Sequence, residues 1–314
     1  MIALCGDVGG TRVKMGVVRE GRVLARTEHL VAAELGVEPV LSVLRSAWMD
    51  LLRGLDLTIQ QCSGIAIAFP SLMDATGRVL DAFGKYPDAV ALDFVSWARH
   101  EFDLSLAIEN DARMALIGEW KYGAARGSEN VVMITLGTGL GTAAVMEGHL
   151  VRGAHGQAGV LGGHLSVHYG GRECNCGNRG CAEAEASTLF LESIARELPE
   201  WPLSSVRNSP LSYAEVFKQA AAGDSCARRL QEHSLEVWGT LAVNLVHAYD
   251  PEVVVLGGGI MAAKDVILPA ITRHIHRHAH TPWGRVRVVA GELGDAAALL
   301  AGEWLLEEQG RNVK

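Results

Sequence analysis

The sequence has no lysine- and arginine-rich run, and basic residues are the minority among its charges. Its 28 Lys and Arg are outnumbered by 36 Asp and Glu, which gives a net charge of −8 at pH 7. Nucleic acids are bound largely through their phosphates by basic side chains. The acidic balance therefore argues against general nucleic-acid binding, and we expect no nucleic-acid partner.

The sequence also lacks a long uninterrupted hydrophobic run. Its longest apolar stretch, residues 131–146, is broken by Gly137, Gly139 and Gly141, which is wrong for a membrane helix. Residues 1–11 show neither the basic segment nor the apolar stretch of a signal peptide. We therefore expect no membrane partner and a cytoplasmic location. With 49% hydrophobic residues, 314 residues can bury a sizeable core as one large domain or two.

Cysteines are few, and half of them gather in one short segment. Residues 164–181 carry three thiols and an imidazole with the spacing H-x9-C-x-C-x4-C: His164, Cys174, Cys176 and Cys181. These residue types at this spacing predict one tetrahedral Zn²⁺ site, and four protein ligands make it structural rather than catalytic. Chance clustering and a redox pair are the weaker alternatives. A disulfide is disfavoured because Cys174 and Cys176 are too close to pair comfortably. Single cysteines elsewhere and a zinc site fit a reducing cytoplasm.

A strand, a glycine turn and a second strand occur twice. Residues 2–5 and 13–18 are predicted strands around Gly6–Thr11, and Glu20-Gly21 turns the chain into a third strand over 22–27. The pattern returns 127 residues later, with strands at 133–136 and 143–146 around residues 137–141 and a second Glu-Gly turn at 147–148. This predicts a duplicated architecture. Chance similarity of two glycine-rich hairpins is the alternative.

The rest of the pattern alternates helices and strands, which indicates an α/β protein. Helices are expected over residues 34–55, 92–102, 112–121 and 296–309. Further strands are expected over residues 64–69, 104–108 and 253–256.

The two glycine turns fail the dinucleotide-binding spacing and are followed by strands rather than helices. Their backbone N–H groups can cradle phosphate, with Arg12 and Lys14 as additional donors. The candidate phosphate-binding residues are Gly9, Gly10, Thr11, Lys14, Gly137, Thr138 and Gly139. For either turn alone, ordinary turn chemistry is the alternative. Gly257, Gly258 and Gly259 follow a buried strand, where glycine allows close approach of a base or ribose.

Two carboxylates complete a candidate phosphoryl-transfer site. Asp111 opens a predicted helix after a short apolar strand, and phosphoryl transfer to an alcohol needs a base for the hydroxyl proton. An ordinary helix N-cap at Asn110-Asp111 is the alternative. Asp7, beside the first glycine turn, is placed to hold Mg²⁺ through water.

The run His274–His280 has two i, i+4 histidine pairs. Because we expect no carboxylate or cysteine partner nearby, a solvated helical face is favoured over a metal site.

These motifs resemble those of the ROK family (repressors, open reading frames and kinases), which consists largely of bacterial sugar kinases. The resemblance rests on five blocks in order: residues 7–11, 108–112, 135–141, 174–183 and 256–259. It implies a two-lobed, actin/hexokinase-like (ribonuclease H-like, duplicated) α/β fold with a structural zinc loop. The expected small lobe comprises residues 1–112 and 296–314, and the large lobe 113–295. ATP and Mg²⁺ are the implied cofactors.

The resemblance also implies residue roles. Asp111 is the expected base, and the expected sugar-binding residues are Asn110, Asp111, His164 and Glu183, with His164 also a zinc ligand. One departure concerns the usual Glu-x-Gly-His motif, since Leu161 takes the place of its glutamate and the loop is shifted. Gln157 is a possible substitute.

The expected function is therefore ATP-dependent phosphorylation of a hexose or N-acetylhexosamine, at its 6-hydroxyl. The alternatives are a non-catalytic sugar-binding protein and a sugar-responsive repressor. The repressor is disfavoured because such members carry an N-terminal helix-turn-helix module, whereas the first predicted strand starts at Ile2. We expect a small-molecule sugar as partner and a homodimer or homotetramer.

Overall fold

The computed structural model describes residues 1–74 and 76–312, which divide into two compact units. The first unit contains residues 1–127 and 152–158 and runs from residue 292 to the end of the described chain. The second contains residues 128–151 and 159–291. The first unit is larger than the small lobe expected from the sequence. The reason is that α3 (Asp111–Tyr122) packs along α9 (Ala297–Asn312).

The two units are built on five-stranded sheets with the same strand order. The first sheet runs β3-β2-β1-β4-β7 and the second β10-β9-β8-β11-β12. In each, the first three strands are antiparallel neighbours and the last two pairings are parallel. The α/β fold and its duplication are thereby confirmed. The strands are β1 Ile2–Val8, β2 Arg12–Arg19, β3 Arg22–Leu30, β4 Gly64–Phe69, β7 Leu106–Asn110, β8 Val131–Leu136, β9 Leu140–Met146, β10 His149–Leu150, β11 Val253–Gly257 and β12 Arg287–Ala290.

The repeated Glu-Gly turns have the same backbone conformation. Glu20 and Gly21 have φ values of 52° and 69°, and Glu147 and Gly148 have 50° and 71°. Consecutive left-handed residues are the geometry of a tight two-residue hairpin.

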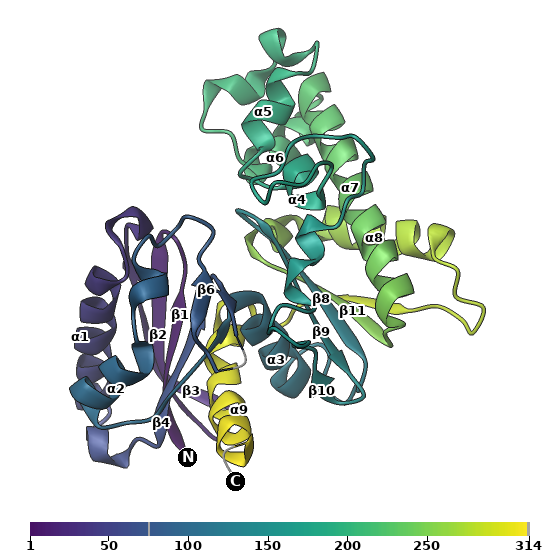
Figure 1. The fold of residues 1–314 in the computed structure, drawn as a ribbon. Helices are drawn as coiled ribbons and strands as arrows, with labels where there is room; N and C mark the ends of the chain where they lie inside the picture. Colours follow the sequence, from purple (N-terminus) through teal and green to yellow (C-terminus); the bar gives the residue numbers. More distant parts are fainter. Residues whose placement is uncertain (75, 313–314) are drawn as a thin grey trace. The chain divides into compact units, whose positions relative to one another are not determined.

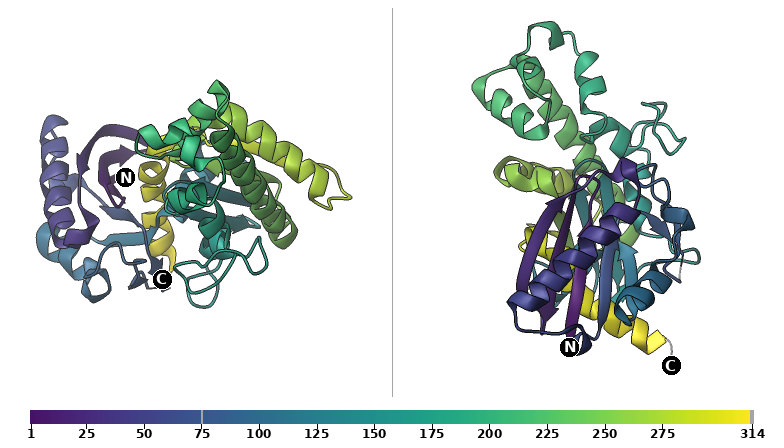
Figure 2. Two further views of the ribbon diagram at one scale, coloured as in Figure 1. Left: turned by 90° about the horizontal axis from the view of Figure 1, so that it is seen from above. Right: turned by 90° about the vertical axis from the view of Figure 1, so that its left-hand side faces the viewer.

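The first sheet has helices on both faces (Figure 1). On one face, α1 (Glu38–Gly54) and α2 (Phe94–Phe102) bury a core that includes Trp48 and Phe102; α1 crosses the strands in the right-hand view of Figure 2. On the other face, Leu299 and Leu300 of α9 pack on Ala3 and Ala66. A short hairpin, β5 (Leu72–Met73) and β6 (Val79–Asp81), follows β4.

The second sheet packs against a helical layer. Residues of α7 (Ser225–Tyr249) and α8 (Lys264–His278) share one core with β8 and β11. The other helices of this unit are α4 Ala182–Ala186, α5 Leu191–Arg196 and α6 Tyr213–Ala222. The 3-10 helices of the chain are η1 Ala33–Leu35, η2 Ile59–Gln61, η3 Ala89–Ala91, η4 Val160–His164, η5 Trp201–Leu203, η6 Ser205–Asn208, η7 Gly259–Ala263 and η8 Gly294–Ala296. No helix within the described ranges is both long and apolar enough to cross a membrane.

Candidate active site and metal centre

The first glycine turn links β1 to β2, and its carbonyl groups are all used internally. The Gly9 carbonyl accepts the Tyr86 hydroxyl at 2.6 Å, and the Gly10 and Thr11 carbonyls accept the N–H groups of residues 33 and 31. Within the described part of this unit, the N–H groups of Gly10 and Thr11 have no hydrogen-bond partner. Unpaired N–H groups in a turn favour an anion such as phosphate.

Asp7 and Lys14 face each other across the β1–β2 ladder beside this turn. Lys14 Nζ lies 3.5 Å from Asp7 Oδ2 and 2.6 Å from Asp295 Oδ1. Burial raises the pKa of Asp7 to about 6; Lys14 opposes this shift, and the charges of Asp111 and Asp295 add to it. A buried carboxylate with others nearby is a suitable place for a divalent cation, whose charge relieves their repulsion.

Asp111 is the first residue of α3, directly after β7. Its Oδ1 accepts the Ala112 N–H at 2.9 Å and the Asn110 Nδ2–H at 3.1 Å. Its Oδ2 has no such bond within the described first unit, which leaves this oxygen for a proton. Burial raises the pKa of Asp111, and the charge of Lys85 partly offsets this.

Asn110 serves as the N-cap of α3. Its Oδ1 accepts the N–H groups of Ala112 and Arg113, and its Nδ2 donates to the Ser71 carbonyl and to Asp111. These four bonds use the whole capacity of the amide. A sugar hydroxyl would therefore have to replace one of them. Asn110 is the N-cap of α3, and this is compatible with a catalytic role for Asp111.

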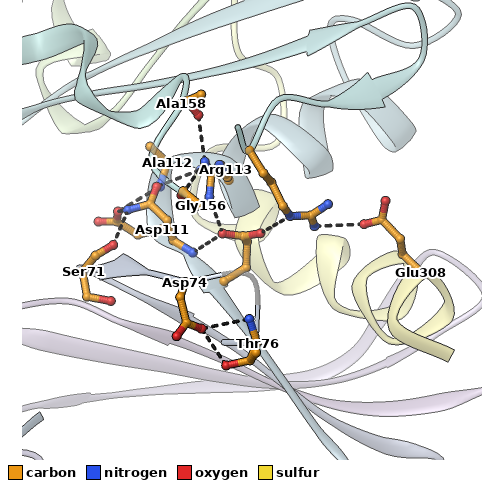
Figure 3. Close-up of polar contacts among 12 residues, drawn as sticks. Ser71, Asp74, Thr76, Asp111, Ala112, Arg113, Gly156, Ala158 and Glu308 are labelled. Carbon is orange, nitrogen blue, oxygen red and sulfur yellow. Dashed lines mark hydrogen bonds and ion pairs between the residues drawn. The ribbon is translucent and has the colours of Figure 1, made fainter. Parts of the chain in front are cut away.

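A network of buried charge surrounds this helix start, and our sequence analysis did not predict it (Figure 3). Arg113 Nη1 donates to Glu109 Oε1 at 3.0 Å. Arg152 lies between two carboxylates, with its Nε 3.0 Å from Glu109 Oε2 and its Nη2 3.0 Å from Glu308 Oε2. The side chains of Glu109 and Arg113 are only 6% and 2% exposed. The i, i+4 spacing of Glu109 and Arg113 is the one signal in the sequence, because Arg152 is 43 residues from Glu109 and 156 from Glu308.

The second glycine turn, between β8 and β9, is hydrogen-bonded to residues that follow the cysteine cluster in the sequence. The carbonyls of Gly137 and Thr138 accept the N–H groups of residues 188 and 189. The Leu140 N–H donates to Glu183 Oε2 at 2.9 Å. Glu183, expected from the resemblance to contact sugar, thus also holds the end of this turn. The N–H groups of Thr138 and Gly139 have no partner within the described second unit.

The structure brings together the four residues of the predicted zinc site. The ligand atoms of His164, Cys174, Cys176 and Cys181 all lie within 4.8 Å of one another. The Cys176 and Cys181 sulfurs are 3.7 Å apart, and Cys174 Sγ is 3.5 Å from His164 Nδ1. Tetrahedral Zn²⁺ with ordinary bond lengths requires about 3.8 Å between sulfurs and about 3.6 Å between sulfur and nitrogen. The donor set and its spacing therefore fit zinc.

The third glycine turn follows β11. Gly258 has φ 90°, and a Cβ there would lie 2.3 Å from the Leu136 carbonyl oxygen, so close approach to β8 requires glycine at this position. Gly259 has open space around its Cα, and Gly257 lies at the end of the strand.

The histidine run lies at the end of α8 and differs from expectation in one respect. Glu236 of α7 is near, with Oε2 3.4 Å from His274 Nδ1, so the expectation of no nearby carboxylate was wrong. His276 Nε2 lies 3.0 Å from the Val286 carbonyl. Within residues 1–74 and 76–312, the only group of three or more potential ligands suited to a metal ion is that around His164.

Leu161 and Gln157 fall in different units. Leu161 is half-buried in η4, three residues before the zinc-ligand candidate His164, and departs from helical geometry at φ −90° and ψ 16°. Gln157 lies in the segment 152–158, which belongs to the first unit with Asp111.

A model of the ROK family matches residues 3–309. The chain belongs to the ROK family. It is 30% identical over 315 residues to a glucokinase of Halalkalibacterium halodurans, covering 96% of this chain and 94% of that protein. A xylose repressor of Bacillus subtilis is 25% identical, covering 76% of this chain and 59% of the repressor.

Among solved structures, a ROK family glucokinase from Streptomyces griseus, in complex with glucose and AMPPNP, is 26% identical with a TM-score of 0.81. The match covers 98% of this chain and all of that one. The two-lobed ROK kinase fold expected from the sequence is thereby confirmed.

Proposed function

We propose that this ROK protein is an ATP-dependent sugar kinase that phosphorylates the 6-hydroxyl of a hexose or N-acetylhexosamine, with Asp111 as general base. The geometry of Asp111 carries the proposal. One carboxylate oxygen is held by Ala112 and Asn110, while the other is available to accept the hydroxyl proton. A base held at a helix start loses little orientation entropy during transfer.

The nucleotide is assigned to the glycine turns. Their carbonyls are engaged internally and their N–H groups are available, which suits phosphate oxygens. Gly257–Gly259 would accept the base or ribose. Asp7 would hold Mg²⁺, directly or through water, and the ion would neutralise phosphate charge. The glucose and AMPPNP bound to the Streptomyces griseus relative support both ligand assignments.

Zinc would be held by His164, Cys174, Cys176 and Cys181, and its chemistry there is structural. A closed four-ligand site fixes the loop that precedes Glu183, two residues after Cys181. The zinc would thus position His164 and Glu183, the proposed sugar-binding residues of the second unit.

Leu161 is proposed to move sugar preference away from free glucose. An apolar side chain gives up hydrogen bonds to hydroxyls, while a site built to bond a hydroxyl discriminates strongly for it. A sugar modified near C1 or C2 would leave fewer polar groups unpaired. That the chain forms a homodimer or homotetramer stays a prediction.

A coupled ADP-release assay tests the function. Glucose, N-acetylglucosamine, N-acetylmannosamine and a methyl glucoside are compared by kcat/KM, with Leu161→Glu beside the wild type. We expect turnover with at least one modified sugar, a millimolar or higher KM for glucose, and improved glucose use by Leu161→Glu. Submillimolar KM for glucose in the wild type would contradict the role of Leu161.

A non-catalytic sugar sensor is the second candidate, because repressors are among the similar proteins. Calorimetric sugar binding without ADP release from any sugar in the panel would favour it over the kinase.

A further inference from the structure

The buried charge network of the first unit holds a short chain segment, residues 152–158, whose neighbours in sequence on both sides belong to the second unit. Residues 152–158 lie between β10 and η4, which both belong to the second unit, yet the segment itself packs with the first. Arg113 Nη2 donates to the carbonyls of Gly156 at 2.9 Å and Ala158 at 2.7 Å (Figure 3). One guanidinium therefore holds two carbonyls of this segment.

Glu109 fixes Arg113 in place. Its Oε1 accepts both Arg113 Nη1 at 3.0 Å and the Asn110 N–H at 2.8 Å, and its Oε2 accepts Arg152 Nε at 3.0 Å. Glu308 pairs with Arg152 in turn, so two cations face two anions. A buried ion pair seldom adds net stability over an apolar pair, which favours a positional role for this one.

The opposite side of the segment is equally constrained. Gly156 has φ 73°, and a Cβ there would lie 2.2 Å from the Met73 carbonyl oxygen, so only glycine fits. Ser71, two residues before Met73, accepts Asn110 Nδ2 through its carbonyl. The segment is therefore held between Arg113 and the β5 region, both of which also contact the Asn110-Asp111 helix start.

We propose that Arg113, locked by Glu109, is the positioning residue that sets the segment 156–158 beside Asp111 as part of the sugar subsite. This rests on the proposed kinase function. Because the peptide is planar and trans, the N–H of Gln157 points away from Arg113 when the Gly156 carbonyl points toward it. That N–H would donate a hydrogen bond to a hydroxyl oxygen of the sugar. The half-buried Gln157 side chain would be a second group available to bind the sugar.

Steady-state kinetics with the best sugar of the panel test the proposal in Arg113→Lys and Arg113→Ala. Lysine keeps the charge but loses the fork that reaches two carbonyls. We expect the sugar KM to rise about tenfold or more in both variants. This is the change expected from the loss of one hydrogen bond to a charged group. The KM for ATP should stay within about twofold, since Arg113 makes no contact with the glycine turns within the described first unit. Added guanidinium should lower the sugar KM of Arg113→Ala.

Arg45→Ala is the matched control, because Arg45 also pairs with a glutamate in the first unit, Glu101 at 2.8 Å, but on α1. Its kinetics should equal those of the wild type. If Arg113→Ala fails to fold, Arg152→Gln takes its place, with a smaller rise in sugar KM expected.

Hydrogen exchange of the free protein separates this inference from the kinase function. Peptides covering residues 152–158 should exchange faster in Arg113→Lys than in the wild type, with the rest of the first unit unchanged. A wild type without kinase activity would end the kinase proposal, and the sugar subsite with it. An active wild type whose Arg113 variants change neither sugar KM nor this exchange, or raise the KM for ATP and sugar equally, would overturn the positioning role alone.

Discussion

The two glycine turns occupy equivalent places in two sheets of the same strand order, but their surroundings differ. The turn of the first unit lies beside ionisable groups, with Asp7 and Lys14 paired across its strands. The turn of the second unit is held by an uncharged backbone framework and by one carboxylate, that of Glu183. Both turns leave N–H groups without a partner within their described units, so the duplicated backbone presents the same donor groups twice.

The difference lies in what each sheet adds to that geometry. The first sheet continues through β7 to Asp111, and burial raises the pKa of Asp7, with a smaller contribution from the charges of Asp111 and Asp295. The second continues through β9 to the loop that holds the cysteine cluster. Under the proposed function, duplication would separate two tasks: proton and cation chemistry in the first unit, and positioning by a metal-held loop in the second.

The largest expected effect comes from removing the proposed base of the first unit, Asp111. Asp111→Asn keeps the shape and the bonds to Ala112 and Asn110 but cannot accept a proton. We expect kcat to fall by about 10²–10⁴, with the melting temperature and nucleotide binding nearly unchanged. Single-turnover phosphate transfer with the best sugar measures it. More than a tenth of wild-type turnover would exclude Asp111 as the base.

Removal of a metal ligand tests the second unit. Cys176→Ser changes an exposed side chain, so packing loss is small and the effect reports the metal. We expect one Zn²⁺ per wild-type chain by elemental analysis, and in the variant lost zinc, lower thermal stability and weaker sugar binding. Cys62→Ser, a cysteine outside the cluster, is the control and should retain its zinc. A metal-free wild type with full activity would disprove the structural role.

The bond between Glu183 and the second turn should couple the zinc loop to nucleotide binding. Glu183→Ala removes the acceptor of the Leu140 N–H, whereas Glu183→Gln retains an oxygen there. Loss of a bond to a charged group costs about 1.5–3 kcal/mol, or about 10–100-fold in KM for ATP in the alanine variant. Glutamine should recover most of it. Equal KM for ATP in all three proteins would show that Glu183 acts on sugar alone.

The features that depend on residues close together in the sequence were predicted correctly. The strands around both turns, the helix start at Asp111 and the zinc cluster were predictable, because alternation, capping and ligand spacing each act within about twenty residues. The helix and strand limits moved by a few residues; β7, for example, extends to Asn110 rather than ending at Ile108.

Long-range pairing was not predictable. Arg113 bonds carbonyls 43 and 45 residues away, and Glu183 bonds a turn 43 residues before it. Edge strand β12 was missed, and residues 152–158 were expected in the large lobe, although tertiary contacts attach them to the first unit. The carboxylate near His274 comes from another helix, where sequence distance hides it.

The smallest expected effect contrasts two aspartates whose pKa values move in opposite directions. Burial raises the pKa of Asp7 to about 6, so the native state binds a proton more tightly than the unfolded state. The free energy of unfolding therefore falls as the pH rises from about 4 to 6. Asp7→Asn should not show this decrease, because asparagine does not titrate. Lys14 keeps its closer partner Asp295 in that variant.

In the second unit, burial works to raise the pKa of Asp224, but bonds from Ala227 and Ser205 hold it at about 2. Its stabilisation is complete above pH 4 and is lost as the pH falls toward 2. In thermal melts with EDTA and no nucleotide, Asp7→Asn should equal the wild type at pH 4 and exceed it at pH 7 by at least about 1 kcal/mol. Asp224→Asn should instead be less stable at pH 7. A stability difference between wild type and Asp7→Asn that does not change from pH 4 to 8 would mean that Asp7 has an ordinary pKa, and the contrast between the two aspartates would then be lost.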